Sequence, residues 1–210
     1  MSSPTEWMKN EYNDLVKKGF DWKPPVIGGP STGRTVIDGK ERIMLCANNY
    51  LSMSNHPKVK QAAIDAVKSH GAGSGSVRPI AGNMDIHNEL EETIARFKNR
   101  EAALYYQTGF AVNSGLIPQL AGKNDAIISD QLNHGSIIDG VRLSGVKKEN
   151  RTIYAHNDMG ELEDRLKEAT NKCEKTLVIS DGVFSMDGDI APLDEITKLE
   201  YYPETDEATS

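Results

Sequence analysis

The stretch TLVISDGVFSMDGD, residues 176–189, joins a short apolar run to a polar loop rich in glycine and aspartate. The run has the length and the β-branched content of a buried strand. Similar runs occur earlier, at residues 102–106, 126–129 and 153–155. Segments with helical periodicity separate them, and short strands that alternate with helices favour an α/β fold. We therefore predict an open, mostly parallel sheet with helices on both of its faces.

The helices are predicted from apolar residues at helical spacing. One apolar face runs through residues 57–70 and ends before Gly71, and others run through residues 86–97 and 159–169. A shorter helix-like segment, residues 7–18, precedes the Pro/Gly-rich passage PPVIGGP.

Residues 35–45, TVIDGKERIML, predict a β-hairpin. Two apolar-rich runs flank Asp38-Gly39, which is a good two-residue turn signal. We divide the chain into an N-terminal arm and hairpin at 1–55, a large domain at 56–199 and an acidic tail at 200–210.

Composition and charge argue against several classes of function. The chain has 210 residues and a formal net charge of −7, which disfavours binding to nucleic acid or to a membrane surface. No signal core and no membrane-spanning stretch is recognisable, so we expect a cytoplasmic protein. Cys46 and Cys173 are expected to be reduced thiols. The histidines have no metal-ligand spacing, so no metal site is predicted.

Residues 105–113, YYQTGFAVN, can hold a phosphate group. They lead from a predicted strand through Thr108 and Gly109 into a helix that starts near Phe110. The first turn of a helix has unpaired amide donors and the positive end of the helix dipole. An ordinary turn capped by Thr108 explains the same pattern when the segment is taken alone.

Two further polar side chains follow predicted strands, where ligands collect in open α/β sheets. His134 lies in a loop after the strand at 126–129, where it can stack on a flat ring or guide a proton. The hydroxyl of Ser185 can bond a cofactor oxygen, and no Gly-x-Ser-x-Gly elbow surrounds it. Taken alone, each has a plainer explanation as a solvated or turn residue. His56, His70, His87 and His156 are left as solvated or capping histidines.

The glycine-rich segment GAGSGSVRPIAGN, residues 71–83, follows a predicted helix and not a strand. It therefore lacks the context of a dinucleotide-binding fingerprint. An active-site loop that offers Arg78 to an anionic substrate fits better.

Taken together, seven segments resemble a known family. They are CANNYLSMSNHP, GAGSGSVRPIAGN, HNELEETIARF, YYQTGFAVNSG, ISDQLNHGSIIDGVRL, AHNDMGELE and ISDGVFSMDGDIAPLDEI. They look like those of the α-oxoamine synthases, fold type I pyridoxal-phosphate enzymes that acylate amino acids with acyl-CoA. The resemblance implies that residues 56–199 are part of an aminotransferase-like large domain that binds pyridoxal phosphate.

Within this family, HGSIIDGVRL at residues 134–143 favours the glycine C-acetyltransferase branch, which acts in threonine degradation. Glycine and acetyl-CoA would then be the substrates, and 2-amino-3-oxobutanoate and CoA the products. In the reverse direction, 2-amino-3-oxobutanoate and CoA would give glycine and acetyl-CoA. The 8-amino-7-oxononanoate synthase branch is the alternative within the family. A homodimer is also implied, because the glycine-rich loop commonly completes the partner's site.

The resemblance also implies roles for single residues. Gly109 and Phe110 would bind the cofactor phosphate through their backbone amides. His134 would stack on the pyridine ring and contact the amino-acid substrate. Ser185 would bond the phenolic oxygen of the ring. Asn48, in CANNYL, would contact the substrate.

In this family the lysine that binds the cofactor covalently lies beyond the position of Leu199, together with an aspartate and a second histidine. The segment that follows here, EYYPETDEATS, matches none of them. We therefore assign no catalytic residue, and expect the chain alone to bind pyridoxal phosphate weakly and to turn over poorly or not at all. The alternatives are a truncated, non-catalytic fragment and a partner subunit that pairs with a longer homologue.

Overall fold

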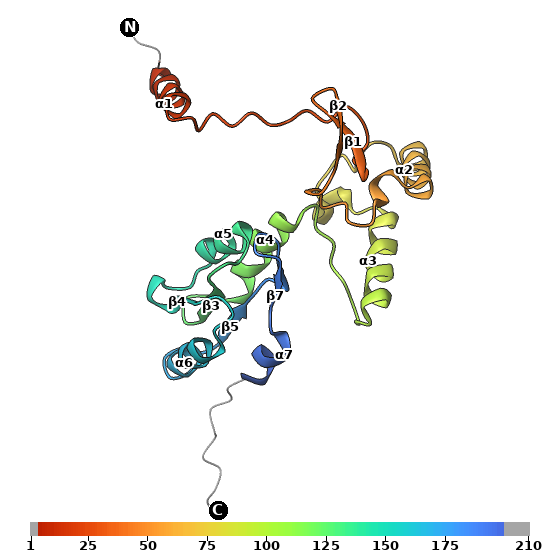
Figure 1. Ribbon diagram of the computed structural model, residues 1–210. Coiled ribbons are helices and arrows are strands. Elements are labelled where there is room, and N and C mark those ends of the chain that lie inside the picture. The colour runs from red at the N-terminus through yellow and green to blue at the C-terminus, as the bar shows by residue number, and fades with distance from the viewer. Residues whose placement is uncertain (1–3, 200–210) are drawn as a thin grey trace, which may run out of the picture. The chain divides into compact units, whose positions relative to one another are not determined.

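The computed structural model describes residues 4–199, which fall into two compact units divided between Asn88 and Glu89 (Figure 1). The acidic tail predicted at residues 200–210 lies outside the described residues. Among the helices of residues 4–199, none combines the length and the apolar character needed to cross a bilayer.

The first unit contains helix α1 (Glu6–Lys17) and a hairpin of strands β1 (Arg34–Ile37) and β2 (Lys40–Ile43). The turn residues Asp38 and Gly39 have φ angles of 49° and 74°. Positive φ at both positions is what a two-residue type I′ turn requires, so the predicted hairpin is confirmed.

The rest of this unit is helical around the glycine-rich loop. Its elements are the short helices η1 (Met53–Asn55) and η2 (Arg78–Gly82) and the α-helices α2 (Pro57–His70) and α3 (Asp85–Lys98), the last of which continues into the second unit. The predicted helices at 57–70 and 86–97 are therefore confirmed. The loop folds tightly on itself, because a Cβ atom at Gly82 would collide with the carbonyl oxygen of Ser76.

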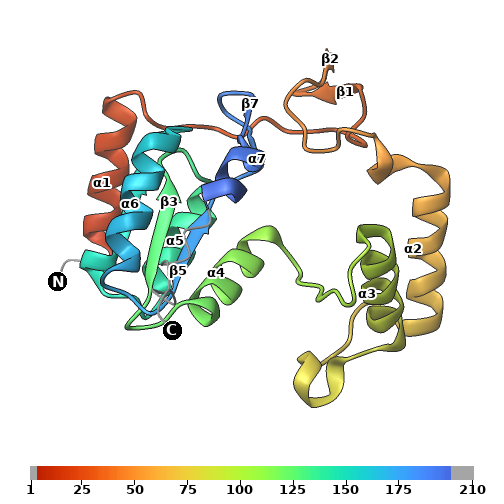
Figure 2. The same ribbon diagram turned by 90° about the horizontal axis from the view of Figure 1, so that it is seen from below.

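The second unit is built on a parallel sheet, with β3 (Ala126–Asp130) between β4 (Arg151–Tyr154) and β5 (Thr176–Ile179). Figure 2 shows β3 and β5 side by side. β3 is buried along its whole length, as expected of the central strand of a sheet covered on both faces. The predicted parallel α/β arrangement is confirmed.

Consecutive residues of β3 pack against different helix layers. Ile127 packs in one apolar cluster with residues of α4 (Gly109–Leu120) and α5 (Gly135–Leu143). Ile128 packs in a second cluster with residues of α6 (Met159–Thr170). Because successive side chains of a strand point to opposite faces, helices cover both sides of the sheet (Figure 1).

The chain then forms a small antiparallel hairpin of β6 (Val183–Phe184) and β7 (Asp189–Ile190). Short helical elements complete the unit: η3 (Lys148–Asn150), α7 (Leu193–Ile196) and η4 (Thr197–Leu199).

The strand predicted at residues 102–106 is wrong. The segment has no regular strand structure. The amide of Tyr105 donates to the Oε1 atom of Glu91 at 2.8 Å, so a carboxylate takes the place of a strand partner there. A short apolar run is compatible with a strand, but a strand forms only where a neighbouring strand is available for pairing.

Candidate functional site

The first part of the candidate site is the beginning of α4. The Thr108 side chain accepts a hydrogen bond of 3.0 Å from the amide of Ala111, which caps the helix as predicted. A Cβ atom at Gly109 would meet no atom of the described residues within 4 Å. Since its φ is not positive, this glycine is required neither for backbone conformation nor for packing. The open space leaves the first amides of α4 accessible to an anion.

His134 lies in the loop after β3, as predicted, and is the N-cap residue of α5. Its Nδ1 atom accepts a hydrogen bond of 3.1 Å from the amide of Ser136 and lies 2.7 Å from the Ser136 hydroxyl. An Nδ1 atom that accepts from an amide carries no proton, so the neutral ring has its proton on Nε2. The side chain is exposed, and it can offer a ring face and one donor to a ligand.

A partly buried side-chain amide connects these two parts of the site. The Nδ2 atom of Asn113, one turn into α4, donates to the Ser136 hydroxyl at 2.9 Å. The helices α4 and α5 approach closely, because Gly140 lies directly against the Asn113 carbonyl oxygen. These contacts therefore fix the position of the His134 ring relative to the start of α4.

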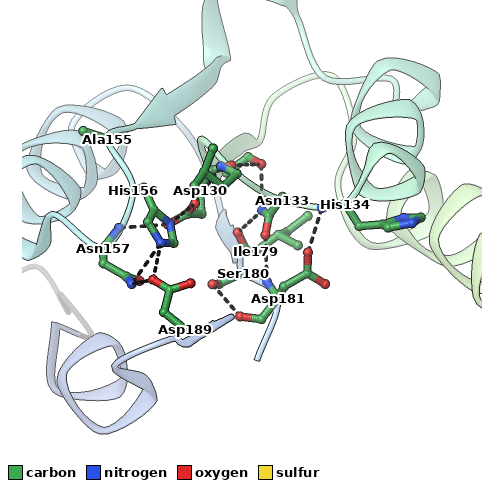
Figure 3. A network of polar contacts seen from close by, with 12 residues as sticks. Asp130, Asn133, His134, Ala155, His156, Asn157, Ile179, Ser180, Asp181 and Asp189 are labelled. Carbon is green, nitrogen blue, oxygen red and sulfur yellow. Dashed lines mark hydrogen bonds and ion pairs between the residues drawn. The ribbon is translucent and has the colours of Figure 1, made fainter. Parts of the chain in front are cut away.

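The end of β5 is joined to His134 by a carboxylate and an amide (Figure 3). The Oδ2 atom of Asp181 accepts from the His134 amide at 2.7 Å. The buried Asn133 accepts from the Asp181 amide at 2.7 Å and donates to the Ile179 carbonyl oxygen, also at 2.7 Å. Two neighbouring strand ends are thus locked together beside the histidine.

The structure places Ser185 and Asn48 on exposed segments. Ser185 lies in the turn between β6 and β7, four residues after Asp181. Asn48 lies in an irregular segment of the first unit. Its neighbour Asn49 donates to the Ser31 carbonyl oxygen and accepts from the Ser54 amide, so Asn49 has a structural role.

The assignment of His156 as a solvated or capping histidine is wrong. Its Nδ1 atom lies 2.9 Å from Oδ1 of Asp130, and its Nε2 atom lies 2.6 Å from Oδ2 of Asp189. Asn157 donates to the same oxygen of Asp189 at 3.1 Å. Figure 3 shows this group of residues beside the Asn133–Asp181 contacts. The position of His156 directly after a strand, like that of His134, was the signal available in the sequence.

Both ring nitrogens of His156 face carboxylates, an arrangement that favours the doubly protonated, positively charged ring. Hydrogen bonds to Asp130 and then to Asp189 raise the pKa of His156, against the opposing effect of burial. Burial favours a higher pKa for Asp130, but hydrogen bonds from His156 and from the amides of Leu132 and Asn157 outweigh it and leave the pKa lowered.

Comparison with known proteins assigns this arrangement to a family. The family model for aminotransferase class I and II matches residues 40–206 of the chain. The chain belongs to this family.

Three relatives describe the similarity. The 8-amino-7-oxononanoate synthases of Alkaliphilus metalliredigens and Thermoanaerobacter pseudethanolicus are 50% and 51% identical over 194 residues, which cover 92% of this chain and 48% of each relative. A serine palmitoyltransferase from S. paucimobilis, solved with pyridoxal phosphate and myriocin bound, is 31% identical with a TM-score of 0.82 over 93% of this chain and 48% of that one. The chain spans about half the length of the relatives it matches.

The predicted resemblance to the α-oxoamine synthases, with pyridoxal phosphate as the family's cofactor, is confirmed. The glycine C-acetyltransferase branch is not supported, because the similar proteins carry the name of the alternative branch, 8-amino-7-oxononanoate synthase. The chemistry of the donors fits the cofactor: open amides at Gly109 suit a phosphate, and the exposed ring of His134 suits a flat heteroaromatic ring.

Proposed function

We propose that this chain contributes the phosphate-binding and ring-binding half of the site of a pyridoxal-phosphate-dependent acyltransferase that joins an acyl-CoA to an amino acid. The observation that carries the proposal is the chain of hydrogen bonds from Asn113 through Ser136 and His134 to Asp181. It ties the start of α4, the stacking histidine and the end of β5 into one rigid surface.

Each residue has a definite task in this proposal. The amides of Gly109 and Phe110 bind the phosphate, where the helix dipole adds to the hydrogen bonds. The ring of His134 covers one face of the cofactor and excludes water from it. Its Nε2 proton points to the substrate side, since Nδ1 is occupied by Ser136.

The family resemblance suggests ligand contacts for two further side chains, Ser185 in the second unit and Asn48 in the first. The hydroxyl of Ser185 donates to the phenolic oxygen of the cofactor, and the amide of Asn48 contacts the amino-acid substrate. When bound, pyridoxal phosphate supplies an electron sink for the amino-acid α-carbon. The covalent lysine of the family lies in the part of the relatives that this chain does not span.

For the specific reaction we propose synthesis of 8-amino-7-oxononanoate. The relatives at 50% identity carry this name. The product has an amine on C8 beside a ketone on C7. Condensation of an amino acid with an acyl thioester would therefore take C8 and C9 from alanine and the other carbons from a seven-carbon acyl-CoA that ends in a carboxylate. Carbon dioxide and CoA leave.

Acetyl transfer to glycine is the second candidate, because the segment HGSIIDGVRL favours it. The two reactions separate in a CoA-release assay with the two substrate pairs, alanine plus the seven-carbon acyl-CoA and glycine plus acetyl-CoA. The assay uses the chain combined with the region that matches the second half of the relatives. Preference for the glycine pair would reject 8-amino-7-oxononanoate synthesis.

Cofactor binding by the chain itself tests the proposed site. We expect Gly109→Val to weaken binding of pyridoxal phosphate by at least about tenfold, because the new side chain enters the space of the phosphate. The midpoint of thermal unfolding should not fall, since that space is open. Gly29→Val is the matched control, because a Cβ atom at Gly29 would also meet no described atom within 4 Å and this glycine lies outside the site. Equal affinity of the Gly109 variant and the wild type would contradict the proposal.

A further inference from the structure

His156 contacts both strands of the hairpin that carries Ser185. Its Nε2 atom donates to Oδ2 of Asp189 at 2.6 Å. Its ring packs edge-on against the ring of Phe184, with centroids 4.4 Å apart and an angle of 83° between the planes. Phe184 and Asp189 are partners across the hairpin, and Ser185 directly follows Phe184.

The hairpin β6–β7 has little internal structure to hold its turn. It contains two residue pairs, and an isolated two-stranded hairpin is marginally stable in water. Phe184 is 2% exposed, whereas Ser185 and the next three residues of the turn are exposed. The contacts of Phe184 and Asp189 with His156 are therefore anchors for the turn.

The other side of His156 is fixed to the sheet. Nδ1 donates to Oδ1 of Asp130 at 2.9 Å, at the carboxyl end of β3. The Asp130 side chain is fully buried, and it also accepts from the amides of Leu132 and Asn157. A buried carboxylate with three donors is a rigid support, because each lost bond would leave charge unsatisfied.

We propose that His156 is a positioning residue: it fixes the β6–β7 hairpin to the end of β3 and so places the Ser185 hydroxyl toward the cofactor. The inference rests on the proposed function for the identity of the ligand. His156 acts through the hairpin and does not itself contact the ligand.

The first test measures the hairpin without any ligand. We expect His156→Gln to increase hydrogen–deuterium exchange in a peptide that covers residues 183–190, with exchange in α5 unchanged. Asp189→Asn is a second variant for the case in which the histidine variant does not fold. It removes the charge of Asp189 and keeps the shape of its side chain. Asp164→Asn, on the exposed face of α6, is the matched control. Unchanged exchange of the hairpin in both His156 and Asp189 variants would overturn the inference.

The second test is a double-mutant cycle on the affinity for pyridoxal phosphate. We expect Ser185→Ala and His156→Gln each to weaken binding by about fivefold, as the loss of one hydrogen bond to the ligand predicts. In the Ser185→Ala background, His156→Gln should have little further effect, because the hydroxyl that it positions is gone. A purely structural role would give additive losses.

The outcomes separate the inference from the proposed function. Absence of pyridoxal-phosphate binding by the wild type would reject the proposed function and this inference with it. Wild-type binding that His156→Gln leaves unchanged, or additive losses in the cycle, would reject the inference alone.

Discussion

The backbone amide of His134 donates a hydrogen bond of 2.7 Å to Oδ2 of Asp181, a residue 47 positions later in the chain. The contact connects the end of β3 to the end of β5, two strands that are neighbours in the sheet. A bond between a backbone amide and a carboxylate is charge-assisted and therefore strong. It fixes the histidine from the backbone, while Ser136 fixes the ring.

We expect Asp181→Ala to lower the free energy of unfolding by about 1.5–3 kcal/mol, which is the usual contribution of a hydrogen bond to a charged group. Urea denaturation of wild type and variant measures it. Asp181→Asn should recover most of the loss because its side-chain oxygen still accepts. Asp187→Ala, in the exposed turn of the same segment, is the control and should change stability little. Equal effects of the Asp181 and Asp187 substitutions to alanine would contradict the prediction.

Two glycines in the packed helices α4 and α5 should respond to alanine with opposite signs. A Cβ atom at Gly140 would lie 2.4 Å from the Asn113 carbonyl oxygen, so Gly140→Ala must push the helices apart. We expect a loss of about 1–3 kcal/mol. At Gly115 the nearest atom is a Tyr106 ring carbon at 3.6 Å, an ordinary contact. There alanine should add about 0.5–1 kcal/mol through helix propensity. Thermal or urea unfolding of both variants checks the prediction, and two losses of similar size would contradict it.

The sequence was sufficient for elements whose signal is local. The helix at 57–70 and the Asp38-Gly39 hairpin follow from periodicity and turn chemistry within the segments themselves. The sequence was insufficient where a segment is held by a residue far away in the chain. The amide of Tyr105 bonds to the side chain of Glu91 and not to a neighbouring strand. The hydrophobic periodicity of the sequence does not indicate this hydrogen bond.

The candidate site shows the same division. The capped turn at Gly109, which is the proposed phosphate site, follows from a strand-like run, a capping threonine and a glycine, although the run itself is not a strand. The role of His156 depends on Asp130, 26 residues before it, and on Asp189, 33 residues after it. An isolated histidine in a sequence does not reveal two carboxylates that come together only in the folded chain.

Stability should depend on pH through the pair of His156 and Asp130. The folded-state pKa of His156 is raised, so its contribution is fully present below about 6.5 and is lost as pH rises through the raised value. The pKa of Asp130 is lowered, so its contribution is present above its unfolded value near 3.8 and is lost as pH falls through the folded value.

The free energy of unfolding should therefore decline on both sides of a maximum, and urea titrations from about pH 3 to about pH 9 measure it. In His156→Gln the decline on the alkaline side should be smaller, because the titrating ring is gone. The two carboxylates that face the ring, Asp130 and Asp189, remain in the variant. An alkaline limb of the same size in both proteins would exclude His156 as its cause.

The hydroxyl of Tyr154 is buried near the side chains of Ser180 and Asp130, and among the described residues it makes no hydrogen bond of good geometry. Burial, and then the nearby carboxylate of Asp130, raise its pKa to about 12, so it stays neutral. A buried hydroxyl without a partner costs folding free energy, whereas the ring itself belongs to the apolar cluster beside α6.

We expect Tyr154→Phe to leave stability unchanged or to raise it by up to about 1 kcal/mol. Tyr154→Leu, which also removes ring volume, should destabilise the protein by about 1–3 kcal/mol. Urea unfolding of the two variants checks both values. A loss above about 1 kcal/mol in the phenylalanine variant would mean that the hydroxyl is bonded in solution, for instance through a buried water.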